Sequence, residues 1–257
     1  MTRKSVGVLL IGLLVAIVIS GCSMFGSGDT YTVATDNNFV PFEFMNEETG
    51  EMEGFDIDLI KAVAKEAGFD IEIESMKFDG VVAGMQSERY DIGIAGMTIT
   101  EERKETIDFS DPYYDAGLML AVQESNNEIK SEADLAGKKV ATRSGTTSET
   151  YLKENHPDAE VVTFPGIVEA YMDLQTGRVD AVMYDVPNVK YYVANDADGT
   201  LKTVGDILQG EQYGIAFPKD SELVEDVNKA LQTLKDNGTY DDIYEEWFGE
   251  RKYGTEG

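Results

Sequence analysis

Strand and helix patterns alternate twice along this chain of 257 residues, and the alternation limits the folds open to it. The first round predicts strands and helices in the order 30–36, 55–68, 69–76, 78–89 and 90–98. The second round predicts them in the order 138–145, 146–155, 159–166, 167–178, 179–185 and 186–196. The helical segments carry apolar residues at helical spacing, and the strands are short apolar or alternating runs. Such repeats predict parallel sheets with helices on both faces.

The two rounds, roughly residues 31–112 and 118–208, are too long together for a single tight sheet, so they predict two lobes. Extended segments follow them at 111–118 and 209–218. The helical pattern from 221 to 249 has no third sheet to join, and we expect it to complete the first lobe. Two adjacent strands that cross between the lobes would form a hinge.

One arginine stands in an unusual place after the strand at 90–98. Thr100 is expected to cap a helix there, which puts Arg103 in the first turn beside Glu101 and Glu102. Acidic side chains suit the positive end of the helix dipole, but an arginine does not. Either an anion outside the helix holds Arg103 there, or Arg103 makes a weak surface pair with a neighbouring glutamate.

Acids, arginines and small-residue turns gather at the carboxyl ends of the predicted strands, where open parallel sheets bind their ligands. These ends are 34–36, 95–98, 143–147 and 183–185. A small zwitterion fits this inventory if both lobes face one cleft. Arg103 would take a carboxylate, helped by backbone N–H groups near Thr98 and Thr147, and Asp185 would accept from an ammonium group.

Asp36 and Arg143 remain for a polar side chain of the ligand, and Phe39 and Phe78 would cover its methylene groups. Each of these residues also has a simpler interpretation. The aspartates and Thr147 are ordinary turn or helix-cap residues, and the phenylalanines are ordinary core residues. Their joint placement at strand ends of two lobes favours a binding site.

The first 22 residues have the pattern of a bacterial export signal. Two basic residues precede an apolar run at 6–19, which is too short to serve comfortably as a permanent membrane span. Cys22 is the only cysteine, and its serine–glycine prefix resembles a lipobox. The resemblance implies removal of residues 1–21 and attachment of lipid chains such as palmitate to Cys22. Residues 22–30 would then be the lipidated cysteine and a flexible tether.

The charge balance and the residue inventory exclude several function classes. The chain has 49 acidic residues against 21 lysines and arginines, a net charge of −28 that argues against a nucleic-acid partner. His156, the only histidine, lies in a polar turn, so no histidine-based nucleophile pair is predicted. No metal-ligand spacing occurs, and we predict neither a metal nor another cofactor.

Seven segments carry a family resemblance that extends over nearly the whole chain from Thr32 to Gly249. They are ATDNNFVPFEF, GFDIDLIKAVAKE, DIGIAGMTITEERKETIDFSDPYY, RSGTTS, AYMDLQTGRVDAVMYD, GEQYGIAFPK and LKDNGTYDDIYEEWFG. Together they resemble the polar amino acid-binding proteins of bacterial ABC importers, solute-binding protein family 3, and the glutamine-binding branch is nearest. The resemblance implies an α/β two-lobed clamshell of periplasmic-binding-protein type II, in which two hinge strands join two doubly wound mixed sheets. It places lobe 1 at 31–112 plus 214–253, lobe 2 at 118–208, and the hinge at 113–117 and 209–213.

The resemblance also implies roles for individual residues at the ligand's α-carbon. Arg103 would clasp the α-carboxylate together with the backbone amides of Thr98 and Thr147. Asp185 and the carbonyl of Gly96 would hold the α-ammonium group.

At the ligand side chain, the resemblance implies a sandwich between Phe39 and Phe78, with Asp36 and Arg143 at the polar end. Three positions depart from the glutamine-binding pattern: Arg143 replaces a lysine, Thr147 a glycine and Tyr184 a histidine. An acid and a base together suit the carboxamide of glutamine, so glutamine is the favoured ligand. Glutamate and arginine are the alternatives.

The function implied is that of an extracytoplasmic, lipid-anchored and monomeric receptor that closes on a polar L-amino acid and delivers it to an ABC permease. Two other functions remain open for the same fold, a dehydratase-like enzyme and a sensor module. We predict that the protein is not an enzyme, because the inventory of the cleft holds no spare, desolvated general acid.

Overall fold

The computed structural model describes residues 29–249. The expected export signal, Cys22, the tether up to residue 28 and residues 250–253 of the expected first lobe lie outside the described residues. Between residues 29 and 249, no helix is both long and apolar enough to cross a membrane.

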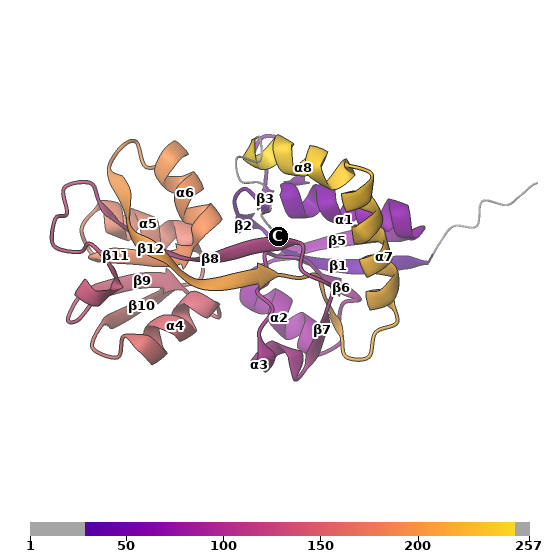
Figure 1. Ribbon diagram of the computed structural model, residues 1–257, viewed down its shortest axis with the longest axis horizontal. Coiled ribbons are helices and arrows are strands. Elements are labelled where there is room, and N and C mark those ends of the chain that lie inside the picture. The colour runs from indigo at the N-terminus through magenta and orange to yellow at the C-terminus, as the bar shows by residue number, and fades with distance from the viewer. Residues whose placement is uncertain (1–28, 250–257) are drawn as a thin grey trace, which may run out of the picture.

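Two five-stranded sheets form the centres of two lobes that lie next to each other (Figure 1). The first sheet has the order β5 (Asp70–Met76), β1 (Thr30–Asp36), β6 (Ile92–Gly93), β13 (Ala216–Pro218) and β7 (Ile107–Phe109). The second has the order β10 (Glu160–Phe164), β9 (Lys139–Arg143), β11 (Ala181–Asp185), β8 (Tyr114–Gln123) and β12 (Leu201–Tyr213). A small sheet of β2 (Asn38–Phe39), β3 (Glu43–Met45) and β4 (Met52–Glu53) belongs to the first lobe.

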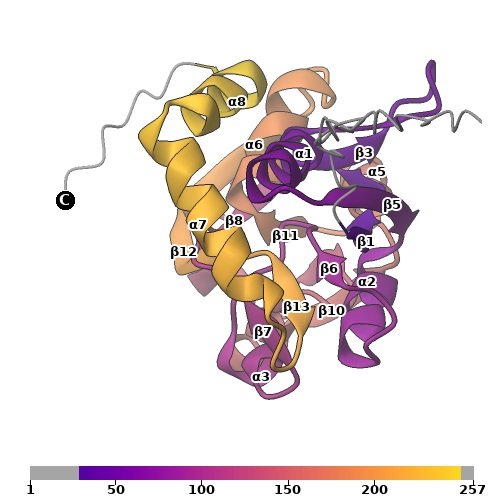
Figure 2. The same ribbon diagram turned by 90° about the vertical axis from the view of Figure 1, so that its right-hand side faces the viewer.

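Helices cover both main sheets. The first lobe has α1 (Phe55–Ala67), α2 (Phe78–Gln86), α3 (Glu101–Lys104), α7 (Leu223–Asp236) and α8 (Thr239–Phe248). The second has α4 (Thr147–Asn155), α5 (Ile167–Gln175), α6 (Val186–Asn195) and the short 3₁₀ helix η1 (Glu132–Asp134). Figure 2 shows α7 and α8 beside α1, so the two last helices pack on a helix of the first lobe.

Apolar spacing explains why these helices sit where they do. In α1, Leu59, Ile60 and Val63 recur on one face and are fully buried. The helix ends at Gly68, whose φ of 83° is in the left-handed region that favours glycine. One apolar cluster continues from these residues through Tyr213 into the second lobe, so the cores of the two lobes meet.

The crossing strands make both sheets mixed, as the family resemblance implied, and not parallel, as the strand–helix pattern alone predicted. β8 and β12 pair with each other in antiparallel fashion from Tyr114–Tyr213 at the hinge to Gln123–Leu201 in the second lobe. β8 is also antiparallel to β11. In the first sheet, β13 returns from the second lobe and runs antiparallel to β6 and β7. β8 and β13 each enter their sheet from the other lobe. Each therefore runs antiparallel to the strands on either side of it.

Two predicted boundaries differ from the structure for local reasons. The strand predicted at 90–98 pairs as β6 only over Ile92–Gly93, because the chain turns at Gly96, whose φ is 52°. The long helix α7 begins at Leu223 with Glu222 at the N-cap position, two residues after the predicted start at 221. Ser221 still accepts a hydrogen bond from the Leu223 N–H at 3.3 Å.

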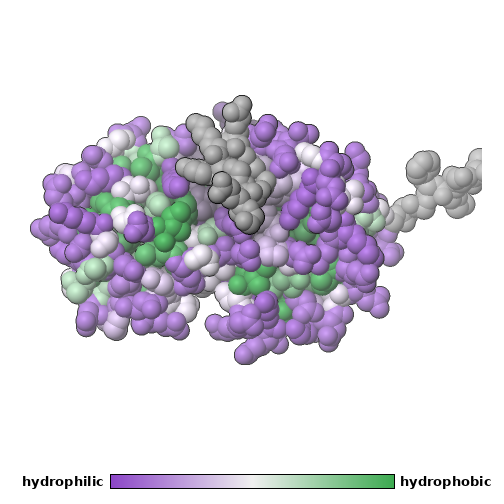
Figure 3. All heavy atoms as spheres, in the orientation of Figure 1, coloured by the Kyte–Doolittle hydropathy of each residue, from purple (hydrophilic) through white to green (hydrophobic). Residues whose placement is uncertain are grey.

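Hydrophilic residues cover most of the face seen in Figure 3, with apolar patches between them on both lobes. This agrees with the dispersed acidic residues of the sequence, which the structure leaves largely exposed.

Candidate functional site

A pocket lies between the lobes, where β1, β9 and β11 end. Its lining consists of Phe39, Phe78, Ala95, Gly96, Thr98, Arg103, Arg143, Thr146, Thr147, Tyr184 and Asp185. Every ligand-binding residue predicted from the sequence is in this lining except Asp36, which is fully buried against Arg143. The structure therefore brings these predicted residues together from both lobes.

Arg103 spans the pocket from the short helix α3. Thr100 caps this helix, as expected, and its hydroxyl accepts from the Arg103 backbone N–H at 3.1 Å. The guanidinium Nη1 donates to the carbonyl of Thr98 at 2.7 Å. Its Nη2 donates to the carbonyl of Gly145 in the second lobe at 3.3 Å. Arg103 thus contacts both lobes through neutral acceptors.

The alternative of a surface pair between Arg103 and a neighbouring glutamate is not observed. Glu101 pairs with Lys104 at 2.8 Å instead, and the Arg103 guanidinium lies 5.3 Å from the ring centre of Phe78. Burial lowers the pKa of Arg103, while Glu211 acts in the opposite direction. A poorly hydrated guanidinium held by carbonyls is well suited to an anionic ligand group, which it can bind in a bidentate manner.

Asp185 faces Arg103 from the end of β11, where it occupies the N-cap position of α6. Its Oδ2 accepts a short hydrogen bond from the hydroxyl of Tyr213. Burial, followed by the charge of Glu211, raises the pKa of Asp185 to about 8, against the hydrogen bond from Tyr213 and the charge of Arg103. The carboxyl group is positioned to accept from a ligand cation, and such a cation would favour its ionised form.

Asp36 and Arg143 form a buried ion pair that joins the lobes. Asp36 ends β1 in the first lobe, and Arg143 ends β9 in the second. Arg143 Nη2 donates to Asp36 Oδ1 at 2.9 Å, and Nη1 makes a shorter contact with Oδ2. Burial alone would lower the pKa of Arg143, but Tyr184 and Asp36 raise it overall. The carboxylate of Asp36 is thereby neutralised within the protein, and only Arg143 and Tyr184 reach the pocket.

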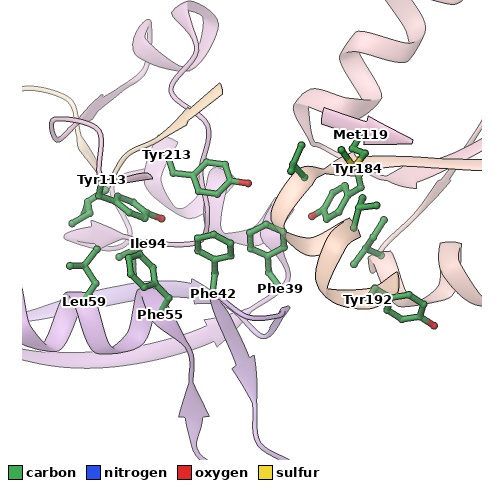
Figure 4. Packing of buried hydrophobic residues seen from close by; sticks show 14 of the residues in the cluster. Phe39, Phe42, Phe55, Leu59, Ile94, Tyr113, Met119, Tyr184, Tyr192 and Tyr213 are labelled. Carbon is green, nitrogen blue, oxygen red and sulfur yellow. The ribbon is translucent and has the colours of Figure 1, made fainter. Parts of the chain in front are cut away.

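Aromatic rings close two sides of the pocket. Figure 4 shows Phe39 of the first lobe next to Tyr184 of the second, with ring centres 5.8 Å apart in an edge-to-face arrangement. Phe39 also stacks on Phe42 at 5.1 Å. Phe78 lies between the two arginines, with the Arg143 guanidinium 5.7 Å from its ring centre. Rings in these positions can cover the methylene groups of a ligand side chain.

The turn at Gly96 needs glycine for two reasons. Its φ of 52° is left-handed. A Cβ atom there would lie 2.3 Å from Cε1 of Phe39, which leaves no room for a side chain. The Gly96 N–H donates to Oδ2 of Asp56 at 2.8 Å. The backbone can therefore approach a ligand closely at this point.

The second lobe contributes a helix N-terminus through α4. Thr146 is its N-cap residue and Thr147 its first residue, so the suggestion that Thr147 itself is the cap is wrong by one position. The hydroxyl of Thr146 donates to the carbonyl of Arg143 at 2.7 Å. This turn holds the first N–H groups of α4 beside the pocket, where they suit an anion.

The lobes are in direct contact around the pocket, which has room for about one water molecule. Besides the Asp36–Arg143 pair, Asn188 on α6 donates to the carbonyl of Val40 at 2.8 Å. A ligand larger than water must therefore separate these contacts to enter, and such a movement is what two crossing strands permit.

Two buried residues on β12 contact residues of the pocket and were not predicted from the sequence, Glu211 and Tyr213. Glu211 is 4% exposed and accepts from the hydroxyl of Thr98 at 3.2 Å. Burial raises its pKa, against the effect of hydrogen bonds from Thr147 and Thr98. Residues two apart in a strand point to the same side, so an acid and a tyrosine in this spacing on a predicted hinge strand were the available signal.

The remaining chemistry-bearing residues lie elsewhere. His156 follows the end of α4 and contacts Glu132 at 3.0 Å, and it is not in the pocket lining. Within the part of the chain that the structure describes, no group of three or more histidine, cysteine, aspartate or glutamate residues is placed to hold a metal ion.

Comparisons with known proteins place this geometry in context. The family model for bacterial extracellular solute-binding proteins, family 3, matches residues 31–250. The L-cystine-binding protein TcyJ of Escherichia coli (strain K12) is 31% identical over 253 residues, which cover 93% of this chain and 94% of the relative. The ABC transporter glutamine-binding protein GlnH of Bacillus subtilis (strain 168) is 33% identical over 271 residues, with 96% and 98% covered.

Solved structures agree with these matches. An ancestral arginine-binding protein, solved bound to glutamine and bound to arginine, is 48% identical and superposes with a TM-score of 0.81 over 86% of this chain and 98% of the ancestral chain. The ancestral amino acid-binding protein AncCDT-1, a precursor of cyclohexadienyl dehydratase, is 41% identical with a TM-score of 0.79, covering 85% and 95%.

Proposed function

The chain belongs to family 3 of the bacterial extracellular solute-binding proteins, and on that premise we propose that it binds a polar L-amino acid between its lobes and delivers it to an ABC permease. L-Glutamine is the favoured ligand. The protein acts as a monomeric receptor without a cofactor, and closure of the hinge retains the ligand.

The observation that carries the proposal is the placement of an arginine and an aspartic acid on opposite lobes of one pocket. Arg103 comes from the first lobe and Asp185 from the second, and both line the same space. An α-amino acid is a zwitterion, so its carboxylate matches the guanidinium and the N-terminus of α4, and its ammonium group matches Asp185 and the Gly96 turn. A ligand held in this way touches both lobes and stabilises their closed arrangement.

The preference for glutamine rests on the far end of the pocket. Asp36 is neutralised by Arg143 and does not line the pocket, so a cationic side chain would find no available carboxylate there. Arg143 can donate to a carboxamide oxygen. Because Arg143 would also accept a carboxylate as partner, glutamate remains the nearest competitor.

Arginine is a second candidate because of one relative. The ancestral arginine-binding protein, 48% identical to this chain, has been solved with both arginine and glutamine. Arginine would fit this chain if the guanidinium of the ligand displaced Arg143 from Asp36. Binding of arginine therefore requires the Asp36–Arg143 ion pair to break, whereas binding of glutamine leaves it in place.

Isothermal titration calorimetry tests the proposal. The purified protein, freed of bound ligand by unfolding and refolding, is titrated with L-glutamine, L-glutamate, L-arginine, L-histidine and L-cystine. Micromolar or tighter binding of glutamine with weaker binding of the others is expected. A preference for arginine would keep the binding of the α-carbon groups and reject the inferred role of Asp36 and Arg143. No binding of any amino acid would contradict the proposed function.

The proposed location is the outer side of the cell membrane, with a lipid anchor at Cys22. The sequence before residue 29 supports it, through the export pattern and the serine–glycine–cysteine site. Replacing Cys22 with Ser should move the exported protein from the membrane fraction to the soluble fraction. A variant that stays with the membrane would contradict the anchor.

An enzymatic function is the rival that the relative AncCDT-1 makes specific, since that protein is described as the precursor of a dehydratase. The candidate acids are Asp185, which lines the pocket, and Glu211, which does not, and both act on the pKa of Arg103. Asp185 is placed to accept from an ammonium group, and Glu211 already accepts from the hydroxyl of Thr98. Turnover of a bound ligand followed by NMR over hours would decide for the enzyme.

A further inference from the structure

Two carboxyl groups lie together inside the first lobe and do not line the pocket. Glu43 on β3 and Asp56 on α1 are both fully shielded from solvent. Neither carboxylate oxygen of Glu43 has a hydrogen-bond partner among residues 29–249, and the same holds for Oδ1 of Asp56. The two groups are close enough for each to act on the pKa of the other. Two neighbouring ionised carboxylates, one of them without any donor, would be costly in such a place.

The remaining oxygen of Asp56 connects the pocket with the hinge. Oδ2 accepts from the Gly96 N–H at 2.8 Å and from the Tyr113 hydroxyl at 2.8 Å. Gly96 lines the pocket, and Tyr113 begins the first predicted hinge segment. Figure 4 shows Tyr113 near Phe55, the residue before Asp56. One carboxylate oxygen therefore holds a pocket turn and a hinge residue at once.

The other ionisable groups near the pair do not complete its hydrogen bonds. From β1, Asp36 acts on the pKa of Glu43 in the same direction as burial, and from the end of β9 Arg143 acts against it. On α8, the hydroxyl of Tyr240 donates to the carbonyl of Tyr113 at 2.5 Å. None of these groups donates to Glu43 or to Oδ1 of Asp56. A proton on Glu43 would pair one of its oxygens with Oδ1 of Asp56 and would remove the charge from the other.

We propose that Glu43 and Asp56 share one proton at neutral pH, with Glu43 donating to Oδ1 of Asp56, and that this pair positions the Gly96 turn and Tyr113 for ligand binding. Both acids are positioning residues, since they act through Gly96 and Tyr113. The positioning role rests on the proposed function, whereas the sharing of the proton does not.

The direction of the pKa shifts assigns the proton to Glu43. Burial raises the pKa of Glu43 well above its usual range, and the nearby Asp56 and Asp36 raise it further. Burial also raises the pKa of Asp56, but the hydrogen bonds from Gly96 and Tyr113 act against burial, so that the pKa of Asp56 is about 6. At neutral pH the pair thus holds a neutral glutamic acid and an ionised aspartate that accepts from Gly96 and Tyr113.

A retained proton makes stability depend on pH with a fixed sign. In the unfolded chain a glutamate ionises near pH 4.3, whereas folded Glu43 keeps its proton. Above that pH, folding takes up a proton, so the unfolding equilibrium constant of the wild type rises with pH, by up to about tenfold per pH unit until the folded pKa is reached. Replacing Glu43 with Gln keeps the donor and removes this dependence.

Urea unfolding of the purified protein between pH 5.5 and 8.5 measures this effect. The ratio of the wild-type unfolding constant to that of Glu43→Gln should increase by up to about tenfold per pH unit. The control is Glu72→Gln on β5 of the same lobe, an exposed acid for which the ratio should stay constant. A ratio for Glu43→Gln that is equally constant would overturn the shared proton.

Carbon-13 NMR of the glutamate-labelled wild type gives a second measurement that does not depend on a variant folding. The carboxyl signal assigned to Glu43 should keep its protonated chemical shift at pH 7. The assignment must separate it from Glu211, whose pKa burial also raises. If the Glu43 signal is that of an ionised carboxylate at pH 7, the proposal is wrong.

Ligand affinity tests the positioning role. Asp56→Asn should weaken binding of the amino acid found by calorimetry about tenfold at pH 7.5, because a charged acceptor for Gly96 and Tyr113 is lost. At pH 5, wild-type Asp56 is itself mostly protonated, so the loss should shrink to below about threefold. The control is Asp58→Asn in the same helix, whose carboxylate accepts from the Trp247 indole at 2.9 Å. Its effect should be equal at both pH values.

The outcomes separate the two proposals. If the wild type binds an amino acid and the effect of Asp56→Asn is the same at both pH values, the positioning role is overturned and the proposed function stands. If the wild type binds no amino acid at either pH, both are overturned. The unfolding and NMR measurements decide on the shared proton in either case.

Discussion

Arg103 illustrates how much of the candidate site depends on a single side chain. Its guanidinium is held by carbonyls of both lobes, at 2.7 Å and 3.3 Å, and not by a carboxylate. Replacing Arg103 with Ala should leave the fold intact and weaken amino acid binding by on the order of 3 kcal/mol or more, because a buried ligand carboxylate loses its partner. Calorimetry measures the affinity, and thermal unfolding checks the fold.

The next residue provides the control for this prediction. Lys104 is also a cation in α3, but it pairs with Glu101 at the surface, where its side chain is 48% exposed. Replacing Lys104 with Ala should change the affinity by less than about 0.5 kcal/mol. Equal losses for the two variants would mean that charge in α3, and not the geometry of Arg103, supports binding.

The raised pKa of Asp185 predicts that the protein releases a proton when an amino acid binds. Burial raises its pKa to about 8 in the ligand-free protein, with Glu211 acting in the same direction, so the group is largely protonated at pH 7. A ligand ammonium group favours the ionised form, and a proton must leave as it binds. Below pH 8 the affinity should therefore fall with decreasing pH, by up to about tenfold per unit. The released proton belongs to the coupled acids Asp185 and Glu211 together.

Calorimetry in phosphate and in Tris at pH 7 measures this release, because the two buffers take up a proton with different enthalpies. The observed binding enthalpies should differ between the buffers for the wild type. The difference should decrease for Asp185→Asn. Equal enthalpies in both buffers for the wild type would show that Asp185 is already ionised before the ligand arrives.

The residues of the pocket could be predicted from the sequence more easily than the contacts between them. Arg103 could be found because it stands against the helix dipole, and Asp185 because it ends a buried strand. The pairing of Asp36 with Arg143 joins residues 107 positions apart in different lobes, and no local pattern indicates which pairs will meet. Glu211 was not predicted to lie near the pocket, because a glutamate in an extended, polar segment is typical of an exposed residue.

Among the elements, the hinge strands β8 and β12 pass close to each other at one glycine. At Gly117 on β8, an added Cβ would lie 2.7 Å from Cγ2 of Ile207 and 3.0 Å from the carbonyl oxygen of Leu208. Backbone atoms cannot yield as a side chain can, so Gly117→Ala should lower the free energy of unfolding by about 1–3 kcal/mol. Urea unfolding provides the measurement.

Gly210 on the partner strand is the matched control. Nothing lies within 4 Å of the position that its Cβ would take. Gly210→Ala should therefore change the free energy of unfolding by less than about 0.5 kcal/mol. If both alanine variants are equally stable, the hinge strands are free to separate at Gly117 and do not hold the lobes at a fixed distance.

The same two strands explain why the sheet topology was only partly predictable. The strand–helix rounds that form β1, β5, β9, β10 and β11 have clear periodicity. β12 runs for 13 residues from Leu201 to Tyr213, but it alternates little and contains Gly205 and Gly210. Its pairing with β8 is irregular between Val204 and Glu211, so a period-two pattern cannot persist along it. Long-range pairing, and not propensity, makes this segment a strand.

At the scale of the whole molecule, the ion pair between Asp36 and Arg143 holds the two lobes in contact. Asp36 is fully buried in the first lobe, and Arg143 is 2% exposed in the second. Removing one member of a buried pair costs about 3–5 kcal/mol when the other charge stays buried. In a hinged molecule the cost can be avoided, because opening the cleft returns Arg143 to water.

Asp36→Asn is therefore expected to separate the two lobes and not to unfold the protein. Small-angle X-ray scattering of the ligand-free protein should give a larger radius of gyration for Asp36→Asn than for the wild type, while the urea midpoint changes little. The double variant Asp36→Asn with Arg143→Met removes the unpaired charge and should return the radius to near the wild-type value, since an apolar side chain is again buried in the closed arrangement. An unchanged radius together with a large fall in the urea midpoint would show that the lobes behave as one rigid body. Hinge closure would then not be how this protein retains its ligand.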